Sequence, residues 1–311
     1  MRLGVLGTMV WDRIEHPDAP TVERWGGLSY SLAAAAAALP AGWELRPVMK
    51  VGSDLAEAAH SFLRTLPAVD GPEGILEVPE PNNRVHLRYR DAHHRHECLT
   101  GGVPPWSWDE LGPRIAGLDA LYVNLISGFE LELATARRLR AAFDGPLYAD
   151  LHSLLLGVSG SGDRTPRPLA DRGAWLGAFD VVQANETELA LVAAGDDPVA
   201  VAEAAVRQGL GAVLVTRGPR GADWFAAADA PRPWETGGTA GPVARGTVPL
   251  AGPARTGDPT GCGDVWGATC FVALLDGRRL TRAMAEANAA AVRNLGHRGA
   301  EGLHLHLRTS R

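Results

Sequence analysis

Short apolar runs alternate with amphipathic helical patterns along most of the chain, and this alternation constrains the fold more than any other feature. In the second half, strands are expected at residues 121–125, 147–150, 181–184 and 212–216, and helices at 130–143, 186–194 and 198–208. A helix between two strands carries the chain back across one face of a sheet, so the two strands run parallel. The sequence therefore predicts an α/β fold with a mostly parallel central sheet and helices on both faces.

The first third of the chain begins with the same pattern and then departs from it. Strands are expected at 3–6, 21–25 and 47–51, and a helix over residues 29–39 follows the pair Gly26-Gly27. Between about residues 82 and 102 apolar and polar residues alternate with period two, which is typical of a β-hairpin. We expect this hairpin to project from the main body.

The charged residues exclude several classes of protein. A formal net charge of −6 argues against a nucleic acid or an anionic membrane as partner, because both require a basic face. The basic residues are 29 arginines and a single lysine, Lys50. No glycine loop precedes Lys50, so the chain lacks the Gly-Lys-Ser/Thr motif of a P-loop.

Cysteine content and hydrophobic patterning set the expected environment. The three cysteines include no Cys-x-x-Cys pair and predict neither a disulfide framework nor a zinc finger. The chain starts with a strand pattern rather than a signal peptide, and the alanine run 33–38 is much shorter than the roughly 20 apolar residues that span a bilayer. We therefore expect a cytoplasmic protein.

A glycine-rich turn precedes an apolar helix late in the chain. The turn is Asp258-Pro-Thr-Gly-Cys-Gly-Asp264, and the helix is expected to follow at once, over residues 265–275. The first N–H groups of a helix lack intrahelical partners and carry partial positive charge, so glycines at this point let an anion approach closely. A carboxylate at such a site is explained if Asp264 is a general base for a hydroxyl during phosphoryl transfer. The alternative is that Asp264 only caps the helix.

Two further motifs follow expected strands, and ligands of open α/β sheets bind at the carboxyl ends of strands. Asp12 stands beyond the first strand and is a candidate ligand contact or an ordinary turn residue. Asn185-x-x-Glu188 follows the strand 181–184. Its residues suit a hydrated Mg²⁺, which prefers a carboxylate with waters and phosphate oxygens, but the same pattern is a helix capping box.

Two other clusters have both a functional and a plain interpretation. Thr216-x-Gly218-x-x-Gly221 follows the strand 212–216 and suits either a phosphate-binding turn or a surface turn. Residues 93–96, His-His-Arg-His, invite a metal interpretation. Histidines at a hairpin tip among arginines lack the fixed geometry of a metal site, so we do not assign a metal to them.

Taken in this order, the motifs resemble those of the ribokinase-like (PfkB) carbohydrate kinases. The matching elements are Asp12 after the first strand, the Gly26-Gly27 pair, Asn185-x-x-Glu188, Thr216-x-Gly218-x-x-Gly221, the turn 258–264, and Asn288 in a helix before Gly299-Ala300. The turn 258–264 is the specific element, and the others support it by their order and spacing. The resemblance covers the whole chain. It implies one α/β domain, residues 1–311, with a β lid formed by about residues 9–25 and 82–103.

The resemblance also implies an activity, namely phosphorylation of an alcohol group of a sugar or sugar-like molecule by ATP and Mg²⁺. It implies that Asp264 is the base, that Gly261, Cys262 and Gly263 supply the anion hole, that Asn185, Glu188, Thr216, Gly218, Gly221 and Asn288 bind the nucleotide and its metal, and that Asp12, Gly26, Gly27 and Ser31 bind the acceptor. Glu188 would hold Mg²⁺ through water. A monovalent cation such as K⁺ and a homodimer formed through the lid are further candidates.

Three positions depart from the family pattern. Ser31 stands where the family usually has asparagine, Cys262 where alanine is common, and His152 where the sequence Asp150-x-Asn is usual. Two of these departures concern residues that would contact the acceptor. The resemblance therefore does not predict which acceptor is phosphorylated.

Two alternative functions also stay open. A nucleoside or vitamin-alcohol kinase would use an aromatic-lined pocket, for which Trp11 and Tyr30 are candidates. A nucleotide- or sugar-binding regulator without catalysis is the other, although Asp264 and its glycines argue against it.

Overall fold

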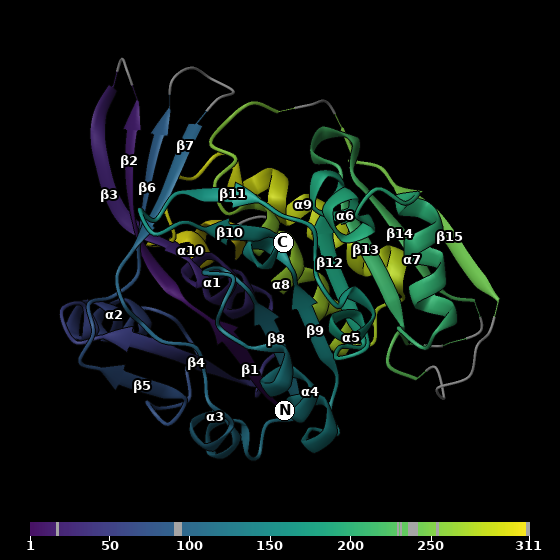
Figure 1. Ribbon diagram of the computed structural model, residues 1–311, viewed down its shortest axis with the longest axis horizontal. Coiled ribbons are helices and arrows are strands. Elements are labelled where there is room, and N and C mark those ends of the chain that lie inside the picture. The colour runs from purple at the N-terminus through teal and green to yellow at the C-terminus, as the bar shows by residue number, and fades with distance from the viewer. Residues whose placement is uncertain are drawn as a thin grey trace.

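A nine-stranded sheet forms the centre of the molecule (Figure 1). The computed structural model describes residues 1–16, 19–89, 95–228, 230, 232–235, 242–252 and 255–308. The strand order is β15 (Val243–Val248), β14 (Ala222–Ala227), β13 (Ala212–Thr216), β12 (Val181–Asn185), β9 (Leu147–Asp150), β8 (Ala120–Asn124), β1 (Arg2–Gly7), β4 (Glu44–Gly52) and β5 (Ile75–Val78). All pairings from β13 to β5 are parallel, and β14 and β15 add an antiparallel edge.

Helices cover both faces of this sheet, as the alternating pattern predicted. One face packs against α1 (Leu28–Ala38), α2 (Ala56–Arg64), α8 (Cys262–Leu275), α9 (Leu280–Asn294) and α10 (Leu303–Arg308). The other packs against α3 (Trp108–Ile115), α4 (Leu133–Ala142), α5 (Arg172–Leu176), α6 (Glu186–Ala193) and α7 (Pro198–Arg207). Each face has its own apolar core, because successive residues of a strand point to opposite sides. The predicted fold class is confirmed.

The order of the strands determines where a ligand is expected. From β1 the chain first extends the sheet through β4 and β5 on one side, and then returns to add β8, β9, β12 and β13 on the other. The reversal occurs between β1 and β8. In open α/β sheets ligands bind at the carboxyl ends of strands next to such a reversal.

A second, four-stranded sheet stands apart from the first (Figure 1). Its order is β3 (Ala19–Gly27), β2 (Met9–His16), β6 (Arg84–Tyr89) and β7 (Arg95–Thr100). The hairpin of β6 and β7 was predicted, and β6 pairs in parallel with β2. Val10, Val85 and Leu87 on this small sheet are buried together with Ile126 from the main body.

Short elements connect the two sheets. The hairpin β10 (Leu156–Val158) and β11 (Arg164–Pro166) lies next to β7, where Arg164 pairs with Glu97 at 2.6 Å. The 3₁₀ turns are η1 (His152–Leu155), after β9, and η2 (Gly218–Arg220), after β13.

Among the described residues, no helix is both long and apolar enough to span a membrane.

Candidate active site

Helix α8 begins at the carboxyl ends of the central strands, and the glycine turn fixes its start. Gly261 precedes the helix with φ of 75°, a left-handed conformation that favours glycine. A side chain at this position would also collide with Tyr30, because its Cβ atom would lie 2.2 Å from a carbon of the Tyr30 ring. Both constraints favour glycine at position 261. The backbone at the start of the helix is therefore not covered by a side chain of this residue.

The amide of Cys262 is already used within this turn. Its N–H donates to the carbonyl of Pro259 at 3.1 Å. The thiol is directed toward α9, where Sγ lies 3.3 Å from Nδ2 of Asn294. Burial raises the pKa of the thiol, so Cys262 is a protonated packing residue. The N–H of Cys262, one of the three predicted for the anion hole, is therefore occupied by a backbone carbonyl.

Asp264 lies in the first turn of α8 and is bonded to the last residue of β8. Asn124 donates from Nδ2 to Oδ1 of Asp264 at 2.6 Å and also to Oγ of Ser31 at 2.9 Å. Burial raises the pKa of Asp264, and the charge of His152 and the Asn124 bond oppose this rise. Asn124 thus connects the predicted base to a predicted acceptor contact. Asn124 was not among the residues predicted from the sequence, where its only signal is its place near the end of a buried strand.

Gln183 forms a second connection behind the site. From β12 its Nε2 donates to Oδ2 of Asp150 at 2.9 Å and to the carbonyl of Gly263 at 3.0 Å, while Tyr148 donates to its Oε1 at 2.8 Å. This amide fastens the start of α8 to the ends of β9 and β12. It too was missed from the sequence, where it is one polar residue in an apolar strand.

Asn185 and Glu188 form a complete capping box at the start of α6. Oδ1 of Asn185 accepts from the N–H of Glu188 at 2.9 Å, and Oε2 of Glu188 accepts from the N–H of Asn185 at 2.7 Å. The remaining oxygen, Oε1, lies 3.5 Å from Nδ1 of His152. The cap therefore uses one oxygen of Glu188 and the other contacts His152, so the two interpretations of this motif do not exclude each other.

His152 brings a positive charge to the site. Burial lowers its pKa, but the hydrogen bond and the charge of Glu188 outweigh burial and raise the pKa to about 9. The same pair lowers the pKa of Glu188 against the effect of burial. His152 has φ of 26°, an unusual value for a residue with a side chain. Beside it, burial raises the pKa of Asp150 well above its ordinary value, with the charges of Glu188 and Asp264 adding to the rise.

The next predicted phosphate motif lies beside the capping box. Thr216 ends β13 and is the register partner of Asn185 at the end of β12. Gly218 and Gly221 have φ of 54° and 88°, so both positions favour glycine. Arg217, directly before Gly218, pairs with Glu186 and Asp223. The turn thus places positive side chains and flexible backbone at the same edge of the sheet as Glu188.

Asn288 is placed differently from the other predicted nucleotide contacts. Its side chain is buried in α9 and accepts from Nε1 of Trp266 at 2.8 Å. Its Nδ2 donates to the carbonyls of Val248 and Pro249 at 3.0 and 3.3 Å. The amide therefore joins α8, α9 and the end of β15, and these bonds occupy both of its polar atoms.

The predicted acceptor residues lie on the small sheet and at the start of α1. Asp12 is inside β2 rather than at the end of a central strand, and it is 5% exposed. Gly26 and Gly27 end β3, and a side chain on Gly26 would overlap the Asp12 carboxylate. Gly27 has φ of 57° and begins the turn into α1, on which Ser31 lies.

Arg24, on β3 opposite Asp12, connects the small sheet to the glycine turn. Its Nη2 lies 2.9 Å from Oδ2 of Asp258. Oδ1 of Asp258 accepts from the backbone N–H of Thr260 at 2.9 Å within the turn. Arg24 could not be predicted from the sequence, because it and Asp258 are 234 residues apart.

The two aromatic candidates differ in exposure, because Tyr30 is buried and Trp11 is partly exposed. Tyr30 is 1% exposed and packs on Gly261. Trp11 contacts Trp25 edge to face, with ring centroids 5.1 Å apart. Tyr30 is therefore a packing residue of the glycine turn rather than a stacking surface.

Metal-binding clusters are not evident in the described part of the chain, which contains no group of three or more His, Cys, Asp or Glu able to hold an ion. His93 and His94 of the histidine cluster lie outside the described residues. His96 is described and pairs with Asp163 at 2.7 Å.

Comparison with solved structures identifies the fold. A pyrophosphate-dependent kinase in the ribokinase family has a TM-score of 0.76 and 17% identity, over 98% of this chain and 99% of that one. A ribokinase-like protein of E. coli in complex with ATP and Mg²⁺ has a TM-score of 0.73 and 17% identity, over 99% and 98%. A nucleoside kinase of Burkholderia thailandensis in complex with inosine has a TM-score of 0.72 and 16% identity, over 98% and 94%. The fold is that of the ribokinase-like kinases.

A family match specifies this class further. Residues 164–304, which run from β11 into α10 and include the glycine turn, match the model of the pfkB family of carbohydrate kinases. The resemblance stated from the sequence is thereby confirmed over this part of the chain, and so is the predicted class of enzyme, a phosphotransferase. No match was found among curated protein sequences.

Proposed function

We propose that this protein transfers a phosphoryl group from ATP to an alcohol group of a sugar or sugar-like molecule. One observation carries the proposal. A carboxylate with a raised pKa, Asp264, lies in the first turn of α8, directly after a glycine turn and held by Asn124 at 2.6 Å. A base beside a helix N-terminus is the pair of groups that phosphoryl transfer to a hydroxyl requires.

The residues around Asp264 suggest a role for each oxygen of its carboxylate. Because Asn124 donates to Oδ1, we assign Oδ2 to the acceptor hydroxyl and to its proton. The first N–H groups of α8, with that of Gly263 foremost, stabilise the charge of the transferring group. Ser31 and Asp12 bind other hydroxyl groups of the acceptor, and the small sheet serves as the lid that excludes water.

The donor side is assigned to the edge formed by α6 and η2. Glu188 fits a role toward Mg²⁺ because its capping bond uses Oε2 and leaves Oε1 on the site side. The ion, when bound with the nucleotide, neutralises phosphate charge. The imidazolium of His152 and the turn from Thr216 to Gly221 bind phosphate oxygens from the protein side.

Pyrophosphate is the second candidate for the donor. The observation that favours it is the buried Asn288, whose amide is bonded to Trp266 and to two carbonyls instead of facing a purine. One of the structures with this fold belongs to a pyrophosphate-dependent kinase. Pyrophosphate would use the same anion-binding turn and the same base.

Phosphorylation assays with both donors test the proposal. ATP or pyrophosphate, each with Mg²⁺, is offered together with a panel of sugars, polyols and nucleosides, and phosphorylated product is measured for wild type and Asp264→Asn. We expect one acceptor class to be phosphorylated by wild type, and turnover to fall roughly 10²–10⁴-fold in the variant, the usual contribution of a positioned base. Near-wild-type turnover of Asp264→Asn would refute the assignment of the base. Acceptor binding without turnover by wild type would favour the regulator.

A further inference from the structure

Arg164, the first residue of β11, joins three parts of the fold. Its Nη1 donates to Oε1 of Glu97 on β7 at 2.6 Å, and its Nη2 donates to the carbonyls of Ile126 and Ser127 at 2.7 and 2.9 Å. These partners are 67, 38 and 37 residues away in sequence. One guanidinium group therefore bonds β11 both to the small sheet and to the chain that follows β8.

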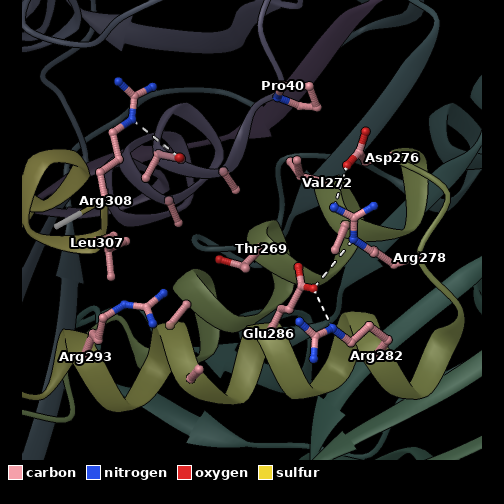
Figure 2. Close-up of a pocket in the computed structure, with 16 residues that line it drawn as sticks. Pro40, Thr269, Val272, Asp276, Arg278, Arg282, Glu286, Arg293, Leu307 and Arg308 are labelled. Carbon is pink, nitrogen blue, oxygen red and sulfur yellow. Dashed lines mark hydrogen bonds and ion pairs between the residues drawn. The ribbon is translucent and has the colours of Figure 1, made fainter. Parts of the chain in front are cut away.

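Other arginines of this protein pair within a short stretch. Figure 2 shows an example beside a cavity of about 460 Å³ among α1, α8, α9 and α10, where Arg282 pairs with Glu286 one helical turn further along α9. Exposed pairs of this kind contribute little to the arrangement of distant elements. The side chain of Arg164, in contrast, is 3% exposed and that of Glu97 is 18% exposed. Removing one partner of such a pair leaves an uncompensated charge in the interior, so the two groups strongly constrain each other's positions.

The carbonyls bound by Arg164 belong to the turn 125–131, between β8 and α4, which borders predicted acceptor residues. The N–H of Ile126 donates to the carbonyl of Asn124 at 3.0 Å, so the turn starts beside the residue that holds Asp264. The side chain of Ile126 lies against Gly27, where an added Cβ atom would be 2.6 Å from Cγ2 of Ile126. The position of this turn therefore sets one side of the space beside Gly27 and Asn124.

The same turn is bonded to the small sheet at a second point. Nδ2 of Asn83, directly before β6, donates to Oγ of Ser127 at 3.0 Å, and the carbonyl of Asn83 accepts from the N–H of Trp11 on β2 at 3.0 Å. Asn83 and Ser127 are both buried. Arg164 thus acts on a turn that is itself in contact with the strands of the small sheet.

Both edge strands of the small sheet are bonded to other parts of the chain. On one edge, the N–H of Leu99 on β7 donates to the carbonyl of Gly162, two residues before Arg164, at 2.8 Å. On the other edge, Arg24 of β3 pairs with Asp258 of the glycine turn. A sheet that is bonded along both edges and at its base has little freedom to swing as a rigid body.

We propose that Arg164 is a positioning residue for the acceptor, and that it holds the small sheet as a fixed wall of the site before any acceptor binds. This inference rests on the proposed function for the identity of the site. With a preformed wall, acceptor binding does not have to supply the free energy of moving and ordering these strands. Loss of the guanidinium should therefore weaken acceptor binding more than it slows phosphoryl transfer, since its bonds go to β7 and to the turn 125–131 rather than to α6 or α8.

Amide hydrogen exchange of the protein without substrates tests the bracing. We expect Arg164→Gln to speed exchange in β6, β7 and the turn 125–131 about tenfold or more, while β12 and β13 keep their protection. Arg140→Gln is the matched control. Arg140 also bonds one carboxylate, that of Asp180, and two backbone carbonyls, but it does so at the amino ends of β9 and β12. This control should leave exchange in β6 and β7 unchanged. Arg164→Lys keeps the charge but loses the fork of donors, so its effect should be intermediate.

Steady-state kinetics supply the second readout. Ribose, myo-inositol and inosine are each offered with ATP or pyrophosphate. For an acceptor that is phosphorylated, KM should rise about tenfold or more in Arg164→Gln with a smaller change in kcat, whereas Arg140→Gln should change neither.

Three results would overturn the proposal. They are unchanged exchange of β6 and β7 in Arg164→Gln, exchange that rises equally in all strands, and a fall in kcat without a rise in KM. If wild type phosphorylates none of the three acceptors, the proposed function fails for them, and the exchange data still decide whether Arg164 braces the small sheet.

Discussion

Arg24 and Asp258 form a partly buried ion pair that joins the small sheet to the turn before α8. Nη2 and Oδ2 are 2.9 Å apart, and the two side chains are 15% and 22% exposed. Asp258 also accepts the N–H of Thr260 at 2.9 Å, so the pair acts on the conformation of the turn itself. A displacement of the small sheet would therefore disturb the backbone that leads to Asp264.

The first prediction concerns this ion pair. Arg24→Gln should lower kcat/KM for the acceptor about 10- to 100-fold, because a partly buried charge on Asp258 loses its partner and the turn loses its tie to the small sheet. Steady-state kinetics measure the effect, and amide hydrogen exchange of β2 and β3 reports on the small sheet independently of turnover. Arg13→Gln is the matched control, since Arg13 pairs with Glu15 and Glu23 within the same sheet and is 51% exposed. Equal kinetics for the two variants would contradict the prediction.

The second prediction concerns Asn124 and the pH dependence of turnover. Its bond to Oδ1 opposes the rise in the pKa of Asp264, so Asn124→Leu should raise that pKa further. Since the base is active when ionised, the acidic limb of kcat/KM should move to higher pH and kcat should fall roughly tenfold or more. A pH–rate profile of the two proteins measures both effects. An unmoved acidic limb would mean that a group other than Asp264 sets it.

Glu188→Gln separates the two roles of the capping box. Glutamine can still accept the N–H of Asn185, so α6 should keep its cap and the melting temperature should change little. The loss of the carboxylate should raise the Mg²⁺ concentration needed for half-maximal turnover several-fold. Titration with Mg²⁺ at saturating donor measures this. An unchanged Mg²⁺ requirement would leave the motif as a helix cap only.

Lys50 makes a prediction about stability. Its side chain is 2% exposed, and Nζ contacts Oε2 of Glu110 and the carbonyl of Pro105 at 2.9 and 2.8 Å. Glu110→Gln should lower the free energy of unfolding by about 1–3 kcal/mol at neutral pH, less than for a fully enclosed pair because Glu110 is partly exposed. Lys50→Met in the Glu110→Gln background should recover part of the loss, and urea unfolding measures both.

The same pair fixes the sign of a pH effect on that stability difference. Burial would raise the pKa of Glu110, but hydrogen bonds from Ser107 and Lys50 outweigh burial and lower the pKa to about 2. A lowered carboxyl pKa stabilises the folded state above the unfolded value of about 4.5 and loses this contribution as the pH falls toward 2. The gap between wild type and Glu110→Gln should therefore narrow between these values. A gap independent of pH would contradict the assigned partners.

The sequence could predict the central sheet because each of its elements is encoded locally. Buried strands such as β8 and β12 are short apolar runs, and the turn at 258–264 has glycines where the backbone conformation needs them. The position of Asp12, in contrast, could not be predicted from the residues around it. It depends on β2 leaving the central sheet and pairing with β3 and β6, which no single stretch of sequence specifies.

The second layer of the site could not be predicted for the same reason. Asn124, Gln183 and Arg24 matter because of partners 140, 80 and 234 residues away, and in the sequence each is one polar residue inside a strand. For Asn288, the helix was predicted from the sequence, but the burial of its amide was not. That burial depends on Trp266 and on the end of β15.

The placement of the site residues along the chain has a consequence for how such an enzyme could be altered. Asp12, Gly26, Gly27 and Ser31 all precede residue 164, where the family match begins, whereas the glycine turn and α6 follow it. In the proposed assignment, the acceptor contacts thus lie in a different part of the chain from the base and the anion-binding turn. A graft that replaces β2, β3, β6 and β7 as one cassette would offer the same phosphoryl-transfer machinery a different molecule.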